Sequence, residues 1–272
     1  MEFYYVNSKN EKLDFTKFPY LAKDISELLN YGHRYKCNGN KISEFYDSVS
    51  EIPFSVNVYA DTKEEYQDAA NRFFEVTEYD FVSGNKGRLY YNGQYVECNL
   101  ISNKKDDWYE EIGFHVAYVN MVTDHPFWIT EDSRQFYPGH KEAEGGLDFP
   151  FDFSFDFASN EKRSERWNVD HLTSSHYKMT MYGPCVNPRI VVNGYPIQVF
   201  TELEANEYMI IESRNHTVTK YLANGTTENA YNSRQFEPSI FEKIPGGLLT
   251  FDWNGTFGFD LTLYLERSEP KW

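Results

Sequence analysis

The stretch FPFDFSFDF, residues 149–157, carries a phenylalanine at every second position: Phe149, Phe151, Phe153, Phe155 and Phe157. Side chains on a β-strand point alternately to the two faces of the sheet, so the five rings would line one face. In a helix the same rings would be scattered around the circumference. The stretch therefore predicts a strand with an aromatic face, and it opens the second half of the chain.

The whole chain, like this stretch, is rich in aromatic residues. It has 272 residues, of which 40% are hydrophobic and 18% aromatic. This length suits two ordinary domains or one large β domain. Aromatic rings favour strands and bury much surface, so we interpret most of them as core. The alternative is a stacking platform for sugars or bases, for which Trp253, Tyr264 and Tyr182 are the candidates.

The formal net charge of −16 comes from acidic residues spread along the whole chain. Such a protein is a poor candidate for gripping nucleic acid, because that affinity comes from clustered Lys and Arg. An acidic surface can still line a passage through which DNA slides. The three cysteines, Cys37, Cys98 and Cys185, are odd in number and form no CxxC motif, which indicates reduced thiols and folding in a cytosol. The sequence contains neither a secretory signal nor an apolar run long enough to span a membrane.

The first half predicts one helix on a mixed sheet. Thr62 and Glu65 have capping-box spacing, and an apolar stripe follows at helical spacing: Tyr66, Ala69, Ala70, Phe73 and Phe74. The expected strands are 52–59, 88–91, 94–101 and 112–122. Asn92-Gly93 predicts a tight hairpin turn between the second and third of them.

Between Thr130 and Leu147 the apolar rhythm stops, and Pro and Gly punctuate a charged stretch. We place a first domain at 1–135, a linker at 136–147 and a second domain at 148–272. The second domain reads as antiparallel strands at 177–182, 189–192, 195–200, 207–212, 217–222, 248–253 and 257–265. Asn193-Gly194, Asn224-Gly225 and Asn254-Gly255 are expected hairpin turns. This pattern predicts a two-sheet β-sandwich, and the fold class as a whole is mainly β.

No motif for catalysis, phosphate binding or metal binding is present. The seven histidines have no metal-ligand spacing, and we expect His125, before Pro126, to be a turn residue. Asp152 and Asp156 share one strand face and could form a glycosidase pair, but the solvated face of the strand explains them better. We therefore expect no enzyme, no catalytic residues, no cofactor and no metal.

The order of several landmarks resembles the distal tail (Dit) protein family of long-tailed bacteriophages. In the first half these are 62–76 with 77–80, the hairpin 87–102 and HPFWITE at 125–131. In the second half they are the phenylalanine stretch, YGPCVNP at 182–188, Asn193-Gly194, EYMIIE at 207–212, SIFEKIPGG at 239–247 and ERSEPKW at 266–272.

The resemblance implies an N-terminal ring-forming belt domain and a C-terminal galectin-like sandwich, assembled as a hexameric ring at the virion tail tip. It implies three sets of partners: the tail tube protein, a tail-associated lysin, fibre or receptor-binding protein, and DNA passing through the channel without specific binding. Synthesis would take place in the bacterial host cytoplasm. It carries over no sugar site, because no His-x-Asn-x-Arg strand precedes Trp253.

Two other functions stay open at this point. The sandwich could be a carbohydrate-binding module that recognises cell-wall polysaccharide of the host, or the carboxylates could belong to a glycoside hydrolase. The resemblance and the lack of catalytic signatures favour a structural hub.

Overall fold

The computed structural model describes residues 1–139 and 163–272. Within these residues the chain is mainly β with a single α-helix, which confirms the predicted fold class. It divides into two compact units: a first unit of residues 1–130 with 266–272, and a second unit of residues 131–265. The phenylalanine stretch 149–157 and residues 140–147 of the expected linker lie outside the described residues.

The chain passes between the units inside two strands, β11 (Trp128–Phe136) and β22 (Phe259–Arg267). This division differs from the expected boundary at 135/136 and returns the last seven residues to the first unit. Phe136, expected to begin a linker, is buried in the second unit and stacks on Phe259 with ring centroids 4.4 Å apart. Since strands carry the chain across, no change of composition marks the division.

The first unit is a sheet with one helix packed on it. Its sheet elements are β1 (Phe3–Val6), β2 (Lys12–Asp14), β3 (Thr16–Lys17), β4 (Tyr20–Asp24), β7 (Ser50–Tyr59), β8 (Gly87–Tyr91), β9 (Gln94–Tyr109) and β10 (Phe114–Thr123), with a 3-10 turn at Ser26–Leu29. The main order is β9-β10-β7-β4-β3, while β8 joins β9 to β1. Phe54, Val56 and Val58 of β7 are buried, as their alternation predicted.

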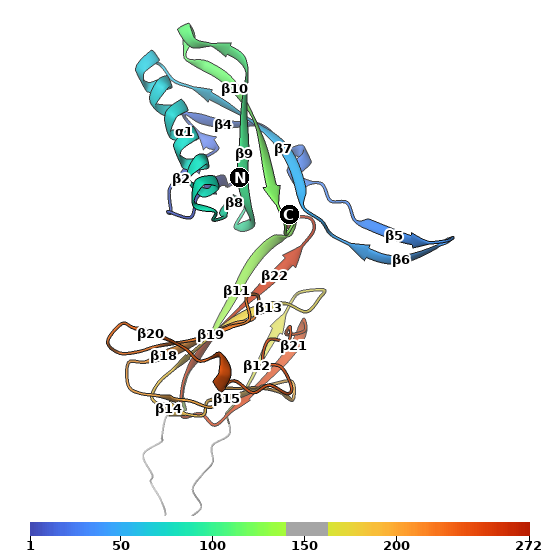
Figure 1. Ribbon diagram of the computed structural model, residues 1–272, viewed down its shortest axis with the longest axis vertical. Coiled ribbons are helices and arrows are strands. Elements are labelled where there is room, and N and C mark those ends of the chain that lie inside the picture. Colours follow the sequence, from blue (N-terminus) through green and yellow to red (C-terminus); the bar gives the residue numbers. More distant parts are fainter. Residues whose placement is uncertain (140–162) are drawn as a thin grey trace, which may run out of the picture. The chain divides into compact units, whose positions relative to one another are not determined.

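Helix α1 (Lys63–Ser83) lies beside β2, β4 and β9 (Figure 1). Thr62 caps it as predicted, because its hydroxyl accepts a hydrogen bond from the Glu65 amide at 3.2 Å. The helix ends at Ser83, seven residues beyond the expected end at Val76, and the left-handed Gly84 follows it. Tyr66, Ala69 and Phe73 are buried as expected.

Phe74 was expected in the same buried stripe, but 58% of its surface is exposed. It lies about 100° around the helix from Phe73, and Val76 and Asp80 occupy the buried face in its place. The prediction for Phe74 was therefore wrong.

The second unit is a two-sheet sandwich, as the sequence predicted. Its strands are β12 (Arg163–Val169), β13 (His176–Tyr182), β14 (Cys185–Val186), β15 (Arg189–Val192), β16 (Tyr195–Gln198), β17 (Glu202–Leu203), β18 (Tyr208–Glu212), β19 (Thr217–Tyr221), β20 (Thr227–Asn229) and β21 (Gly247–Trp253), with the shared β11 and β22. One sheet has the order β20-β19-β18-β13-β22-β11, and the other has β12-β21-β15-β16. Apolar residues from both sheets form one core.

One predicted hairpin is wrong. Asn254-Gly255 joins β21 to β22, but β21 pairs with β12 and β15, while β22 belongs to the opposite sheet. The turn therefore carries the chain across the sandwich. Its geometry is still that of an Asn turn, since the Asn254 side chain accepts from the Thr256 amide at 3.2 Å.

Candidate assembly surfaces

Strands β5 (Arg34–Asn38) and β6 (Lys41–Tyr46) form a hairpin that we call the arm, residues 34–46. It pairs with no other strand in the described part of the chain. Figure 1 shows it extending away from the sheet of the first unit. All of its strand residues are exposed except the half-buried Tyr46. A two-stranded hairpin alone in water is marginally stable, so such an arm calls for a partner.

The arm has an apolar face. Tyr35 lies opposite Phe45, and Cys37 lies opposite Ile42. Side chains of directly opposed residues share one face of the pair, and residues two apart on a strand do so as well. The exposed fractions are 58% for Tyr35, 68% for Phe45 and 54% for Ile42. A contiguous exposed apolar face with free strand edges marks an interaction surface.

A β-bulge maintains this apolar face. The pairing shifts between Lys36 and Cys37, which leaves Ser43 as an extra residue on β6, and its hydroxyl donates to the Lys36 carbonyl at 3.0 Å. Without the shift Ile42 would share a face with Glu44. The opposite face is polar: Lys36 pairs with Glu44 at 2.8 Å and lies over the Tyr46 ring.

The first unit exposes two further apolar groups. Phe74, Phe81 and Val82 lie on the outer side of α1, and Trp108 and Ile112 lie at the tip of the β9–β10 hairpin, around the 3-10 turn Glu110–Ile112. Each of the two groups is a further exposed apolar surface of the first unit, separate in sequence from the arm.

The predicted sugar platform is not formed. Trp253 is buried and its indole donates to the Phe257 carbonyl at 3.0 Å, while Tyr264 is buried with its hydroxyl 2.9 Å from Glu212. Both belong to the packing of the sandwich. Of the three candidates Tyr182 alone is exposed, and its hydroxyl donates to Asp260 at 2.8 Å.

Tyr182 stands in a row across three neighbouring strands. It lies opposite Tyr208, which lies opposite Tyr221. The rings of Tyr208 and Tyr221 stack at 4.6 Å with an interplanar angle of 7°. Each of these two rings covers one face of the other, so the stacked pair has fewer free faces for a sugar than two separate rings would have.

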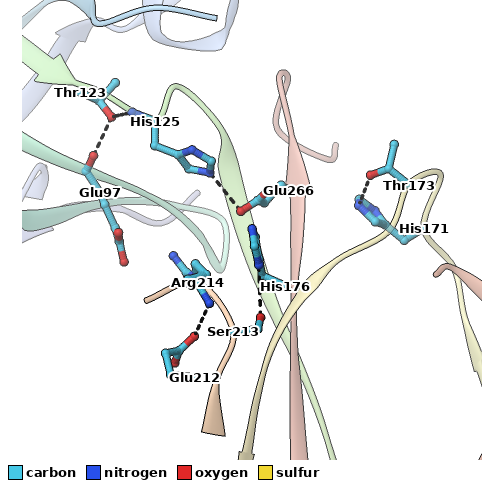
Figure 2. A network of polar contacts seen from close by, with 10 residues as sticks. All are labelled: Glu97, Thr123, His125, His171, Thr173, His176, Glu212, Ser213, Arg214 and Glu266. Carbon is cyan, nitrogen blue, oxygen red and sulfur yellow. Dashed lines mark hydrogen bonds and ion pairs between the residues drawn. The ribbon is translucent and has the colours of Figure 1, made fainter. Parts of the chain in front are cut away.

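Several histidines each have a separate polar partner (Figure 2). In the first unit His125 Nε2 lies 3.0 Å from Glu266, and the His125 amide donates to the Thr123 hydroxyl, as suits a turn residue. In the second unit His176 Nδ1 lies 3.2 Å from Ser213. Within residues 1–139 and 163–272 no three His, Cys, Asp or Glu residues gather as metal ligands would. None of the described helices has the length and apolar character to span a membrane.

One polar cluster fixes the N-terminal strand to α1. The carboxylate of Asp80, which is fully buried, accepts from the Tyr5 hydroxyl and from the Ser8 amide, the latter at 2.8 Å. Asn7 donates to the Val76 carbonyl at 3.2 Å. These bonds satisfy a carboxylate that would otherwise be costly to bury, so the cluster is structural.

Sequence reasoning missed the arm. The signal was present, because Gly39-Asn40 is a two-residue hairpin loop between the paired Asn38 and Lys41, and Gly39 adopts a left-handed φ of 60°. The period of two breaks at the bulge, so the apolar positions 35, 37, 42 and 45 do not read as one face in the sequence.

No protein-family model matches this chain, and a comparison with curated proteins finds no match. The fold does match solved structures. One is the Dit protein of phage SPP1, described as a paradigm of the hub adsorption apparatus in phages that infect Gram-positive bacteria. It is 9% identical, with a TM-score of 0.62 over 97% of this chain and 99% of that one.

Two others are chains of the phage P2 baseplate in its activated conformation. The structure with Ca is 12% identical, with a TM-score of 0.61 over 99% of this chain and 100% of that one. The structure with Sr is 14% identical, with a TM-score of 0.59 over 99% of each. At these identities the likeness establishes a shared fold, and it extends over nearly the whole of every chain.

Proposed function

We propose that this chain is a structural protein of a phage tail tip. Copies of it form a hexameric ring, a hub that joins the tail tube to the host-recognition apparatus. Its first unit is the belt that closes the ring, and its second unit is a galectin-like sandwich. The fold shared with the SPP1 Dit hub protein and with P2 baseplate chains supports this proposal.

A shared fold does not by itself specify a function. The observation that carries the proposal is the arm, whose exposed face of Tyr35, Cys37, Ile42 and Phe45 has no partner within the described chain. If the arm of each copy binds a different surface on the next copy, the contact is head-to-tail. Head-to-tail contacts that close by rotation generate rings.

The remaining partners follow from this role. The tail tube protein would bind one side of the ring, and a tail-associated lysin, fibre or receptor-binding protein the other. DNA would pass through the channel without specific binding, which suits a net charge of −16. The role requires no catalysis, no cofactor and no metal. The carbohydrate-binding alternative is weakened, since two of its three platform residues lie in the core.

Light scattering coupled to size exclusion tests this proposal, with negative-stain images of the same samples. We expect six-lobed rings from the purified chain. Phe45→Glu places a charge on the apolar face of the arm and should shift the population to monomers.

Asn38→Glu is the matched control, because it adds the same charge on the polar face of the arm. It should leave the rings intact. A wild-type chain that stays monomeric at high concentration would contradict the proposal, and so would equal effects of the two substitutions.

A further inference from the structure

The second unit carries an arginine held between aromatic rings. The Cζ atom of Arg234 lies 3.5 Å from the centroid of the Tyr231 ring and 4.1 Å from that of Phe236. A third ring, that of Phe241, has its centroid 5.6 Å from the same atom, so the guanidinium is packed among aromatic rings. Tyr231 and Phe236 are themselves exposed, as is the nearby Phe200. We call Phe200, Tyr231, Arg234 and Phe236 the arginine patch.

The backbone under the arginine patch is fixed by hydrogen bonds. The patch lies mainly in the segment that follows β20, beginning at the 3-10 turn Tyr231–Ser233 (Figure 1). The Phe200 amide donates to the Ser233 carbonyl at 2.7 Å, and the Gln235 amide donates to the Gln198 carbonyl at 2.9 Å. The segment is therefore held to the end of β16, and the rings are in place before any ligand arrives.

No carboxylate in residues 1–139 or 163–272 forms an ion pair with Arg234, whose Nη1 donates to the Tyr231 carbonyl at 2.6 Å. This is notable in a sequence with 42 Asp and Glu against 26 Lys and Arg. The N–H groups of a guanidinium lie in its plane, so those not bonded to the Tyr231 carbonyl can form paired bonds to an oxyanion.

We propose that the arginine patch binds a partner protein through a carboxylate of that protein that lies beside an apolar side chain. The guanidinium would take the carboxylate in its plane, and the exposed rings would cover the apolar neighbour. Tyr and Arg are the residues that most often dominate the affinity of protein interfaces. A side chain fixed by stacking loses little freedom on binding.

This proposal goes beyond the ring, since it concerns the second unit and needs nothing from the arm. The occupant is another protein rather than an anionic wall polymer. Phe200 and Phe236 carry no hydrogen-bonding side-chain group, so beyond Arg234 and the Tyr231 hydroxyl the patch offers few partners for the many hydroxyl groups of a sugar chain.

The test follows the Arg234 side-chain Nε–H signal by NMR in the full-length chain. The probe is the capped tripeptide acetyl-Leu-Asp-Leu-amide, and its counterpart with Asn in place of Asp lacks the charge. We expect a saturable shift with the aspartyl peptide, with a Kd of about 1 mM, and at least tenfold weaker binding of the asparaginyl peptide. Sodium glucuronate and inorganic phosphate are titrated in parallel.

Arg234→Lys keeps the charge but loses the planar fork, so it should weaken peptide binding at least tenfold when followed through the neighbouring backbone signals. Arg189→Gln, on the exposed side of β15, removes one positive charge elsewhere and should leave binding unchanged. If Arg234→Lys does not fold, Phe236→Ala serves in its place, because it removes an exposed ring and retains the guanidinium.

The proposal is overturned if no probe shifts the Arg234 signal, or if the two peptides shift it equally. Binding of glucuronate or phosphate without binding of the aspartyl peptide would also overturn it, and would identify an anionic polymer as the ligand. None of these results bears on ring formation, which the arm substitutions test separately.

Discussion

His115 is a titratable side chain enclosed in the first unit. It is 1% exposed, its Nδ1 lies 2.8 Å from the Tyr66 hydroxyl, and its Nε2 has no hydrogen-bond partner among the residues that the structure describes. Burial, and to a smaller extent the nearby charge of Lys105, lowers the pKa of His115 to about 4. The folded protein therefore holds this imidazole neutral at a pH where the unfolded chain protonates it.

The stability of the first unit should depend on pH through this group. Between about pH 4 and the ordinary histidine value of 6.5, the unfolded chain binds a proton that the folded chain does not. Stability therefore rises with pH across this window and is fully gained above it. Urea unfolding at pH 4.5 and pH 7.5 should give a gain about 2 kcal/mol larger for the wild type than for His115→Asn, which does not titrate.

The wild type and His115→Asn share every other titratable group, so the difference between their pH dependences belongs to His115. If the free energy of unfolding rises equally with pH in the wild type and in His115→Asn, the imidazole is not held neutral by burial.

Gly87 begins β8 where no room for a side chain exists. A Cβ atom built there would overlap the Tyr5 hydroxyl and the Asp80 carboxylate, the cluster that fixes the N-terminal strand to α1. Gly87→Ala must therefore displace a buried, hydrogen-bonded carboxylate. We expect the free energy of unfolding of the first unit to fall by about 3 kcal/mol, measured by urea denaturation.

Gly32→Ala is the matched substitution in open space, since no atom lies within 4 Å of its Cβ position and its φ is not positive. It should change stability by less than about 0.5 kcal/mol. If Gly87→Ala is as stable as Gly32→Ala, the Tyr5–Asp80 cluster can shift without loss of stability and the prediction is wrong.

Among the helices and strands, those with a regular apolar period were predicted correctly from the sequence. The start of α1 and the buried alternation of β7 were read correctly, because Thr62 caps the helix and Phe54, Val56 and Val58 repeat every two residues. The Asn92-Gly93 hairpin was also correct, with positive φ at both residues.

The misses share a physical cause. The side of the sandwich to which a strand belongs depends on tertiary packing, so Asn254-Gly255 looked like a hairpin turn although it joins the two sheets. Likewise the bulge at Ser43 moves Ile42 to the other face of the arm, and no fixed period describes that face. Of the residues on the candidate surfaces, Tyr182 was singled out from the sequence as a binding candidate, whereas Phe74 was interpreted as core and Cys37 as a reduced thiol.

In the whole molecule, β11 and β22 carry the chain between the two units. The expected linker at 136–147 lies outside the described residues from 140 onward, so the expected domain bounds stay a prediction. A strand that continues from one unit into the next has the same alternation on both sides of the boundary. Composition therefore cannot reveal where it crosses.

The three cysteines should differ in their reactivity toward thiol reagents. Cys37 is exposed on the apolar face of the arm, whereas Cys98 and Cys185 are buried. Burial raises the pKa of the Cys185 thiol to about 11 and that of Cys98 as well, so little of either is thiolate at pH 8. A dilute monomer should therefore show one fast-reacting thiol with Ellman's reagent, and Cys37→Ser should show none.

Because Cys37 faces the neighbouring copy in the proposed ring, its reaction should slow at least tenfold at concentrations where rings form. Phe45→Glu, which should keep the chain monomeric, tests the cause: its Cys37 should react fast at every concentration. A thiol that reacts equally fast in rings and in monomers would mean that the copies contact each other elsewhere, and that the apolar face of the arm serves a different partner in the tail.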